Sequence, residues 1–348
     1  MADLSLDPAF LEGYLTRRID GADAVRVVEL VKFPRGVSRE TWFATCAVER
    51  SGAPYTAKLV LRRDLPGGSV CPATLRWEYE IYRRLEGTAV PIARALWFED
   101  DPDWLAGGRE FYVREHVDGT WELPRYANAS RENDGYRVAI AKEHLRKLAS
   151  VHTCDWEGLG FADIMVAPAS PADCATTAID RLVGELDSFQ VEPLPVVEEA
   201  LGWLRDNAPT TASQVCLLKG TNGLGEEVFR GEEIVAMSDW ELASLGDPAS
   251  DFAHVQDFLP EIYRDGAAVW GLAPALDYYE EVSGLRVDPA AVAYYRTLGA
   301  LEMVVFSHNA AIPLINGTDH LARLAWVSTE VLYWSKNLLA GAAGVFAA

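Results

Sequence analysis

Residues 234–251 read Ile-Val-Ala-Met-Ser-Asp-Trp-Glu-Leu-Ala-Ser-Leu-Gly-Asp-Pro-Ala-Ser-Asp, and this stretch decides the fold. The apolar run Ile234–Met237 predicts a buried strand, and Asp239 follows at its end. A carboxylate at the end of a strand is suited to bind a hard cation such as Mg²⁺. We interpret Asp247 and Asp251 as caps of the helix that follows.

The first third of the chain is rich in strand-like runs separated by turn residues. A helical stripe over residues 7–19 precedes them, and a second helix is expected over Ala73–Leu85. Val, Thr and aromatic residues predict strands over Ala24–Phe33, Thr41–Glu49, Tyr55–Arg62, Ala93–Phe98 and Glu110–His116.

The rest of the chain has mainly helical patterns. Helices are expected over Arg131–His152, Thr177–Phe189, Val196–Asn207, Ala249–Phe258, Glu261–Val282, Pro289–Ala310 and His320–Ala340, with short strands over Val215–Lys219, Glu227–Phe229 and Glu233–Met237. Strands followed by helices predict an α+β fold in two lobes. Turn residues near Val117-Asp-Gly119 place the boundary there, so the expected domains are 1–117 and 118–348.

Composition excludes several classes of protein. The chain has 31 Lys and Arg against 52 Asp and Glu, a formal charge of -21, which disfavours nucleic acid as a partner. No stretch approaches the about 20 apolar residues that a spanning helix needs, so no membrane contact is expected. The five scattered cysteines indicate neither disulfides nor a zinc site and favour a cytoplasmic setting. The sequence carries no signal for an oligomeric state.

Five motifs in order carry a family resemblance. They are Val60-Leu-Arg-Arg63, Arg76-Trp-Glu-Tyr-Glu80, Phe111-Tyr-Val-Arg-Glu-His-Val-Asp-Gly119, Leu148-Ala-Ser-Val-His-Thr-Cys-Asp-Trp-Glu-Gly-Leu-Gly160 and Asp239-Trp-Glu-Leu-Ala-Ser-Leu-Gly-Asp-Pro248. The chain resembles the aminoglycoside phosphotransferase family over nearly its whole length. The similar branch contains choline kinases and the hydroxyacyl-CoA kinases fused to acyl-CoA dehydrogenases. The resemblance implies a protein-kinase-like fold, with a small β-rich nucleotide-binding lobe and a larger helical lobe. It also implies ATP and Mg²⁺ as cofactors and a small-molecule substrate.

The resemblance assigns two nucleotide-binding segments. Phe33–Trp42 takes the place of the loop that folds over the phosphates, where Gly36 permits a tight turn and Ser38 contacts phosphate oxygens. A plain hairpin explains the same residues equally well. Glu115 to Val117 form the linker whose backbone pairs with the adenine edge.

The resemblance also implies a phosphate-binding ion pair. Arg62 matches the strand residue that contacts the α- and β-phosphates, and Glu78 matches its partner on the following helix. Dense phosphate charge calls for a fixed cation, and the carboxylate holds that cation in place. Because Arg63 and Arg76 lie nearby, a shift of the assignment stays open, as does the alternative that these are surface charges.

The segment Lys219-Gly-Thr-Asn-Gly-Leu-Gly-Glu-Glu227 replaces the family's catalytic loop. The family pattern is His-Gly-Asp, four residues and Asn. Thr221 therefore stands where an Asp accepts the substrate proton, and Glu226 stands where an Asn binds metal. Threonine is no base at neutral pH, and loss of a positioned base typically costs about 10²–10⁴ in rate.

The altered loop still offers charged groups. Glu226 supplies a carboxylate oxygen, so that Asp239 and Glu226 would form a two-carboxylate metal site, although a one-residue shift would place Glu227 there. Lys219 is expected to direct a cation toward the phosphates or the substrate. Thr221 and Lys219, with Asp239, are therefore the candidate catalytic residues.

Three functions remain compatible with these residues. The first is ATP- and Mg²⁺-dependent phosphoryl transfer to a small-molecule hydroxyl, because positioning and electrostatics supply most of the catalysis in this reaction. The second is a pseudokinase, a lapsed kinase that binds a nucleotide or an acyl-CoA-like ligand. The third is a changed chemistry on the same fold, with Lys219 and Thr221 as new functional residues. The first is the preferred hypothesis, because Asp239, Arg62 and Glu78 are retained.

Overall fold

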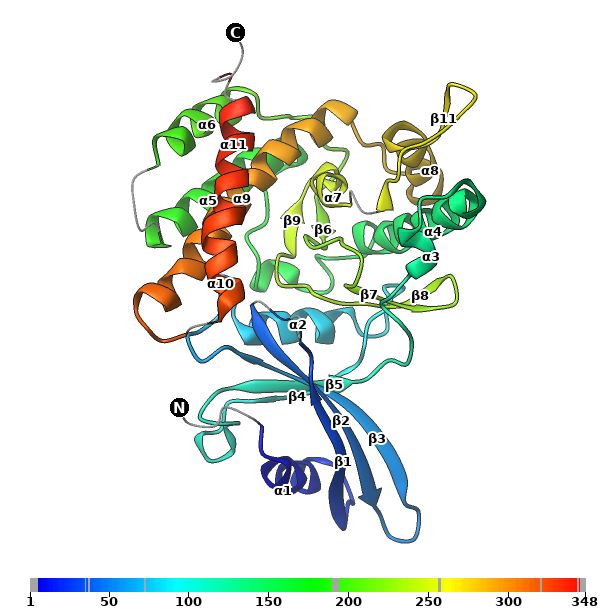
Figure 1. Ribbon diagram of the computed structural model, residues 1–348, viewed down its shortest axis with the longest axis vertical. Coiled ribbons are helices and arrows are strands. Elements are labelled where there is room, and N and C mark those ends of the chain that lie inside the picture. The colour runs from blue at the N-terminus through cyan, green and yellow to red at the C-terminus, as the bar shows by residue number, and fades with distance from the viewer. Residues whose placement is uncertain are drawn as a thin grey trace. The chain divides into compact units, whose positions relative to one another are not determined.

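The computed structural model describes residues 6–34, 36, 38–71, 73–189, 194–255, 258–319, 321–342 and 344. The chain divides into two compact units, which we call the first and the second unit. The first unit consists of Met1–Arg83 and Ala93–Val117, and the second of Arg84–Ile92 and Asp118–Ala348. The sheet lies in the first unit and most helices lie in the second (Figure 1).

A five-stranded antiparallel sheet forms the first unit, in the order β1-β2-β3-β5-β4 (Figure 1). Its strands are β1 (Ala24–Lys32), β2 (Arg39–Glu49), β3 (Tyr55–Asp64), β4 (Ala95–Glu99) and β5 (Phe111–Glu115). Along β2, buried side chains alternate with partly exposed ones, as expected for a strand with one face in a core. Helix α1 (Pro8–Arg18) contributes Leu11, Tyr14 and Leu15 to that core.

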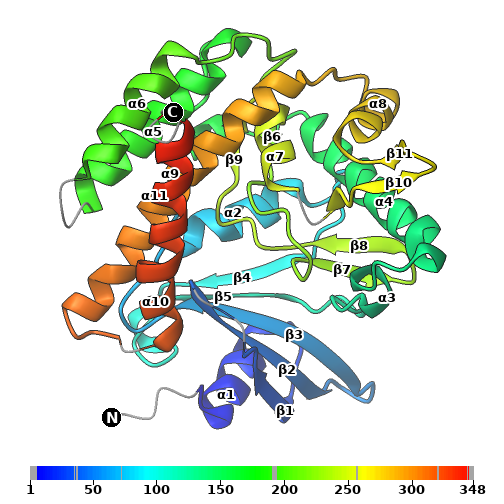
Figure 2. The ribbon, with the colours of Figure 1, turned by 45° about the horizontal axis from the view of Figure 1, so that its top comes forward.

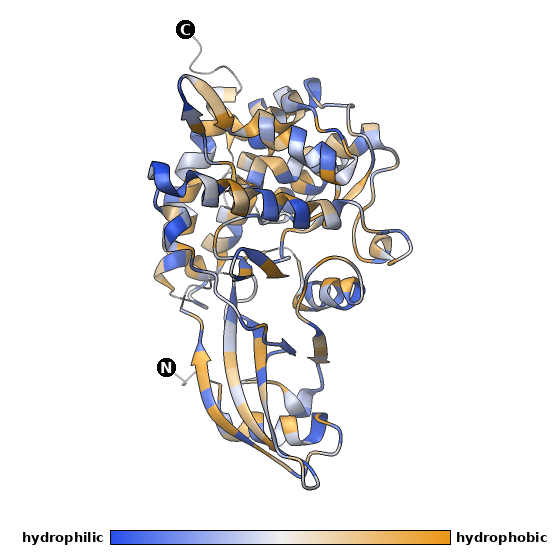
Figure 3. Cartoon of the chain, turned by 90° about the vertical axis from the view of Figure 1, so that its right-hand side faces the viewer, coloured by the Kyte–Doolittle hydropathy of each residue, from blue (hydrophilic) through white to orange (hydrophobic). Residues whose placement is uncertain are grey.

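Most of the second unit is helical. The helices are α3 (Pro124–Ala127), α4 (Asp134–His152), α5 (Cys174–Phe189), α6 (Pro195–Asp206), α7 (Pro248–His254), α8 (Leu272–Ser283), α9 (Pro289–Ile315), α10 (Ala322–Trp326) and α11 (Leu332–Ala342), with a π-helical turn at Val327–Val331. Helix α9 packs against α5, α7 and α11 (Figure 2). Most of these helices carry both hydrophobic and hydrophilic segments, as Figure 3 shows. Amphipathic helices of this kind bury one face, and a large hydrophobic cluster of this unit is built from such faces.

Two short strand pairs position the candidate catalytic segments. Strand β6 (Cys216–Leu218) pairs with β9 (Ser244–Gly246), and β7 (Glu227–Arg230) pairs with β8 (Glu233–Met237). The segment from Lys219 to Glu226 connects β6 to β7, and Asp239 lies in the connection from β8 to β9. One connection runs from β6 to β7 and the other from β8 to β9. Because β6 pairs with β9 and β7 pairs with β8, the two connections lie in the same part of the second unit.

The expected α+β class is confirmed, with one clear error in the element assignment. Glu261–Val282 was expected to be one helix, but it contains strands β10 (Ile262–Arg264) and β11 (Ala267–Trp270) before α8 begins. Asp265 and Gly266, between these strands, have φ values of 51° and 81°. An Asp-Gly pair with two positive φ angles is the preferred two-residue hairpin turn, and this signal outweighs the helical spacing of apolar residues.

Other expected elements differ only at their ends. Helix α2 (Leu75–Leu85) and the strands of the first unit lie where they were expected. A 3-10 turn, Arg131–Asn133, precedes α4, and α7 ends at His254 rather than at Phe258. His320, the expected start of the last helix, lies outside the described residues. Strand β9 was not expected, because its three residues form a strand by pairing with β6, which is distant in the sequence.

Helix α9 corrects the statement that no stretch approaches a membrane-spanning length. Its 27 residues include a window of mean hydropathy 1.4, which passes a length-and-composition test for a membrane span. Within the fold, 61% of that window is buried. Central helices of a packed core pass the same test, because they are apolar on most sides.

Candidate active site

Glu78 is the centre of a buried ion-pair cluster in the first unit. Its Oε1 lies 2.8 Å from Arg62 Nη1, and its Oε2 lies 2.7 Å from Arg39 Nη1. The Tyr112 hydroxyl donates to Oε1 at 3.0 Å. The side chains of Glu78 and Arg39 are fully buried. One carboxylate therefore orients two guanidinium groups, from β2 and from β3.

The register of β3 resolves which arginine meets Glu78. Arg62 contacts Glu78, whereas Arg63 Nε donates to Glu40 Oε2 at 2.5 Å. Arg76 pairs instead with Asp100, where both side chains are at least half exposed. Successive side chains on a strand point to opposite faces, so Arg62 and Arg63 cannot share one carboxylate.

Electrostatics keeps Glu78 ionised. Burial by itself raises the pKa of Glu78, but the charges of Arg62 and Arg39 and the Tyr112 hydrogen bond outweigh it. The pKa of this carboxyl therefore lies below its ordinary value of 4.5.

The candidate phosphate loop is described only in part, because Arg35 and Val37 lie outside the described residues. A Cβ atom at Gly36 would overlap the carbonyl oxygen of Arg39. The turn into β2 therefore requires glycine at this position. Ser38 is buried at the entrance of β2.

The candidate adenine linker follows β5. The Glu115 carboxylate pairs with Arg94 at 2.8 Å on the surface, and the Glu115 N–H donates to the Arg94 carbonyl. Val117 is the last residue of the first unit. The His116 N–H donates to the Lys58 carbonyl, so the N–H groups of both Glu115 and His116 already have partners within the first unit.

Asp239 has an unusual backbone conformation. Its φ of 64° lies in the left-handed region, which costs a residue other than glycine about 1–2 kcal/mol. Several contacts hold the turn around it: the Thr221 hydroxyl donates to the Asp239 carbonyl, and Ser238 N–H donates to the Glu226 carbonyl at 3.0 Å. The neighbouring Trp240 is fully buried, and its indole N–H donates to the Met237 carbonyl. The turn is thus fixed by both side-chain and backbone groups.

Lys219 points into the second unit and is fully buried. Its Nζ lies 3.2 Å from Glu227 Oε1 and 3.7 Å from Glu226 Oε2, and it donates to the Thr221 carbonyl. The ammonium also lies 5.9 Å from the centre of the Trp240 ring, within cation–π range. The structure thus surrounds this cation with groups of its own loop, of β7 and of the turn after β8.

Several carboxylates share that one cation. Burial lowers the pKa of Lys219, but the charges of Glu227, Glu226 and Asp239 outweigh it and hold the pKa above its ordinary 10.5. Burial raises the pKa of Glu227 to about 7, against the opposing charge of Lys219, and the charge of Glu226 adds to that rise. Lys219 is therefore charged near neutral pH, and the carboxyl of Glu227 ionises less readily than an ordinary glutamate.

Glu226 is partly exposed and held by its own loop. Its Oε2 accepts a hydrogen bond from the Gly223 N–H at 2.8 Å, and 27% of its side chain is exposed. Within the described residues, no group of three or more His, Cys, Asp or Glu side chains is arranged to hold a metal ion. Mg²⁺ is often bound by one or two carboxylates together with substrate phosphates. Asp239 and Glu226 each offer a carboxylate of that kind, and two carboxylates are too few to hold a cation by protein groups alone.

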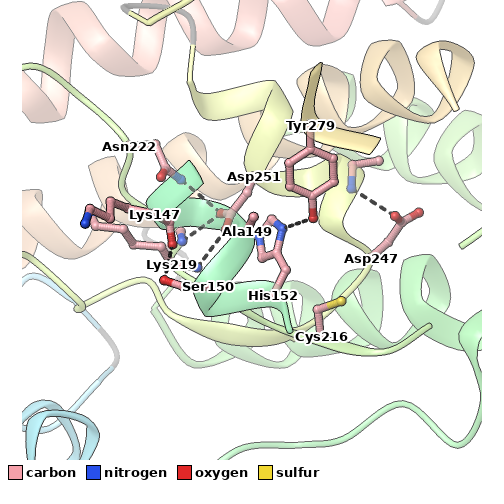
Figure 4. Close-up of polar contacts among 12 residues, drawn as sticks. Lys147, Ala149, Ser150, His152, Cys216, Lys219, Asn222, Asp247, Asp251 and Tyr279 are labelled. Carbon is pink, nitrogen blue, oxygen red and sulfur yellow. Dashed lines mark hydrogen bonds and ion pairs between the residues drawn. The ribbon is translucent and has the colours of Figure 1, made fainter. Parts of the chain in front are cut away.

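Asp251 holds the loop after β6 in place, as Figure 4 shows. Its Oδ2 accepts from Lys219 N–H at 2.7 Å, and its Oδ1 accepts from Gly220 N–H at 2.8 Å and from Asn222 Nδ2 at 3.0 Å. His152 Nε2 lies 2.9 Å from Oδ2. The interpretation of Asp251 as a helix cap is therefore wrong, whereas Asp247 does cap α7 by accepting from Ala249 N–H.

His152 extends this network toward α8. Its Nδ1 lies 2.6 Å from the Tyr279 hydroxyl, and both side chains are buried (Figure 4). Burial raises the pKa of Asp251, but its bonds to His152 and to the loop N–H groups outweigh burial and hold the pKa below 3.8. The sequence contained a signal for this role, because His152 falls inside one of the five motifs without any other assignment.

Gly220→Ala is expected to destabilise the protein by about 2 kcal/mol or more. Gly220 has a φ of 82°, and a Cβ there would overlap the Leu242 carbonyl, so alanine meets both backbone strain and a clash. Urea unfolding measures the change. Gly184→Ala, in the middle of α5 with no atom near the added methyl, is the control and should stabilise by about 0.5–1 kcal/mol. Equal effects of the two substitutions would contradict this reading of the loop.

Comparison with known proteins identifies several relatives. A model of the phosphotransferase enzyme family matches residues 29–285. Acyl-CoA dehydrogenase family member 11 of Mus musculus is 27% identical over 258 residues, which is 71% of this chain and 30% of the relative. Member 10 of the same species is 25% identical over 252 residues, which is 70% of this chain and 21% of the relative. The matches thus span less than a third of these curated relatives.

Solved structures are similar over almost the whole chain. A protein of Ralstonia eutropha described as a candidate aminoglycoside phosphotransferase superposes with a TM-score of 0.67 at 21% identity, covering 97% of this chain and 98% of that one. A variant of APH(4)-Ia in complex with AMP-PNP and hygromycin B has a TM-score of 0.57 at 14% identity, covering 96% and 97%. At these identities the likeness establishes the protein-kinase-like fold.

Proposed function

Because the chain belongs to the phosphotransferase enzyme family, we propose that it transfers a phosphoryl group from ATP to the hydroxyl of a small molecule. The observation that carries this proposal is the ion pair of Arg62 with the fully buried Glu78. A buried pair of this kind contributes little net stability, because desolvation offsets its attraction. A guanidinium held in one orientation is, by contrast, well suited to bind phosphate.

Each unit supplies a distinct set of groups in this proposal. In the first unit, Arg62 contacts the phosphates, Gly36 and Ser38 belong to the phosphate loop, and the linker from Glu115 to Val117 binds adenine. The nucleotide complex of the similar APH(4)-Ia variant supports ATP as the donor.

Asp239 and Glu226 of the second unit are the proposed Mg²⁺ ligands. When bound, Mg²⁺ would neutralise charge on the phosphates. The Gly223 N–H of the same loop holds the Glu226 carboxylate, which lies near the Lys219 ammonium. The fit rests on oxygen ligands, which Mg²⁺ prefers.

The reaction is expected to be slow in this proposal. The Thr221 hydroxyl donates a hydrogen bond to the Asp239 carbonyl and is no base, and Lys219 is enclosed by Glu227, Glu226 and Thr221. Phosphoryl transfer tolerates a missing base because positioning and electrostatics supply most of the rate. The same hydrogen bond favours a second candidate, a pseudokinase that binds a nucleotide or an acyl-CoA-like ligand without turnover.

The proposed setting is the cytoplasm, which the five free cysteines support. The similar proteins indicate only a general class of substrate. Similar structures contain hygromycin B, streptomycin or gentamicin, and the curated relatives are named for acyl-CoA dehydrogenase families. We therefore propose a small molecule that carries a free hydroxyl.

A thermal-shift experiment with Mg²⁺ and ATP tests the proposal. Ligand at about 100 times its Kd stabilises the folded state by about 2.7 kcal/mol, which should raise the Tm of the wild type by several degrees. Arg62→Met is expected to abolish the shift, and Asp239→Ala should abolish the part that depends on Mg²⁺. Arg76→Met, which alters an exposed pair near Glu78, is the control and should shift like the wild type. A wild type that ATP does not stabilise, with or without Mg²⁺, would sink the proposal.

A further inference from the structure

A continuous polar chain links four residues of the second unit. Glu227 pairs with Lys219 at 3.2 Å, Lys219 donates to the Thr221 carbonyl, and the Thr221 hydroxyl donates to the Asp239 carbonyl. The chain thus runs from the first residue of β7, through the loop after β6, to the turn after β8. Every step joins the altered loop to itself or to the turn that carries Asp239.

The end of this series of polar contacts that holds Lys219 and Glu227 is closed to ligands. The side chains of Lys219 and Glu227 are both 0% exposed, and the ammonium already has a carbonyl, a carboxylate and an aromatic ring around it. An ammonium with these partners would have to give up a buried ion pair to reach a phosphate, and separating such a pair inside a protein is strongly unfavourable. Lys219 therefore acts inside the protein.

The other end of the series is Asp239, whose backbone conformation has to be stabilised by its surroundings. Asp239 keeps a left-handed backbone without being glycine, and such a conformation persists only where the surroundings enforce it. The Thr221 hydroxyl supplies that restraint at the carbonyl of Asp239 itself. A change of this backbone rotates the side chain that starts from the same Cα atom.

We propose that Lys219 and Thr221 are positioning residues, which fix the backbone of Asp239 and thereby the orientation of its carboxylate. Glu227 belongs to the same device, because it holds the ammonium of Lys219. The inference rests on the proposed function in one respect, the role of Asp239 as a metal ligand. In this reading the loop has exchanged a group that accepts a proton for groups that hold the metal-binding turn.

Thr221 offers a matched pair of substitutions. Thr221→Val keeps the branched shape and removes the donor, whereas Thr221→Ser keeps the donor, and the partial exposure of this side chain makes both tolerable. In the ligand-free protein, the amides of residues 238–243 are expected to exchange with deuterium about fivefold to tenfold faster in Thr221→Val, in line with loss of one hydrogen bond. Thr221→Ser should exchange within about twofold of the wild type.

Nucleotide affinity distinguishes a role in positioning the Asp239 carboxylate from a general structural defect. Thr221→Val is expected to weaken binding of ATP with Mg²⁺ by about fivefold to tenfold, and to leave binding of ATP in the presence of a chelator unchanged. Thr221→Ser should restore both values. A purely structural defect would weaken the two forms of ATP equally, and that result would overturn the proposal.

A double substitution tests Lys219 without leaving a buried charge. Lys219→Met alone leaves the buried Glu227 carboxyl without its cation, and this variant is expected to unfold readily. Lys219→Met is therefore combined with Glu227→Gln, so that both charges are removed. The double variant should recover a cooperative thermal transition and still show the fast exchange of residues 238–243 and the Mg²⁺-specific loss of affinity. Exchange and affinity like the wild type in this variant would overturn the role of Lys219.

Failure of this inference and failure of the proposed function are distinguishable. If the wild type binds no ATP, the proposed function falls, while exchange in the ligand-free protein still decides whether Thr221 holds the turn. If the wild type binds ATP with Mg²⁺ and Thr221→Val matches it in exchange and affinity, the positioning role falls and the proposed function stands.

Discussion

Asp251→Ala is expected to lower the free energy of unfolding by about 3–5 kcal/mol and to abolish ligand binding that depends on the loop. The carboxylate accepts hydrogen bonds from the N–H groups of Lys219 and Gly220 and from the Asn222 amide, and it contacts His152. Alanine leaves these groups without an acceptor, and an unsatisfied buried donor costs about 1–3 kcal/mol. The effect is large because one side chain organises several donors.

Urea unfolding of Asp251→Ala beside Asp288→Ala measures this effect. Asp288 caps α9 by accepting from the Ala290 N–H, in an exposed setting, so its loss should cost only about 1 kcal/mol. Asp251→Asn keeps one acceptor oxygen, so its loss of unfolding free energy should lie between those of Asp251→Ala and Asp288→Ala. If Asp251→Ala lost no more stability than Asp288→Ala, the role of Asp251 in organising the loop would be contradicted.

Glu78→Ala is the second substitution with a large expected effect, about 3–5 kcal/mol of unfolding free energy. It leaves the guanidinium groups of Arg39 and Arg62 buried without the carboxylate that they share. Two like charges then face each other in a low-dielectric core, where repulsion is strong. The control is Glu80→Ala on the same helix, because its pair with the more exposed Arg83 should contribute at most about 1 kcal/mol.

The same carboxyl gives a pH dependence with a definite sign. The folded pKa of Glu78 lies below its ordinary 4.5, so its contribution to stability is present above pH 4.5 and is lost as pH falls through the folded value. Glu78→Gln lacks that contribution at every pH. The gap in unfolding free energy between wild type and Glu78→Gln should therefore be widest near neutral pH and narrow below pH 4.5. A gap that stays constant between pH 3 and pH 7 would contradict the assignment.

The sequence predicted those parts of the fold that depend on local periodicity. The strands of the first unit and the long helices have regular alternation or helical spacing, and these patterns survive in the structure because each element buries one face. The hairpin at β10 and β11 was missed because an Asp-Gly turn was read as part of an apolar helix. Strand β9 was missed because its pairing with β6 is a tertiary contact.

The candidate site shows the same division between local and tertiary information. Asp239 was proposed from sequence because it follows an apolar strand, and Arg62 and Glu78 because they match motifs of the family that the chain resembles. The structure brings Arg62 and Glu78 together. Asp251 was misassigned, since nothing local distinguishes a carboxylate that caps a helix from one that accepts bonds 32 residues away.

The burial of Lys219 has the same explanation. Its partner Glu227 lies in a strand whose register no local pattern fixes. A charged residue in a loop is normally exposed, so sequence alone favoured a lysine that reaches outward.

The hydrogen bond from Thr221 to the Asp239 carbonyl makes the effect of one substitution in this loop depend on its neighbours. Aspartate at position 221 would supply a proton acceptor and, in the same step, delete the donor that restrains Asp239. Histidine at position 219 alone would leave Glu227 buried without its present cation. We therefore expect epistasis within the loop, so that changes at these positions are better tolerated together than one at a time.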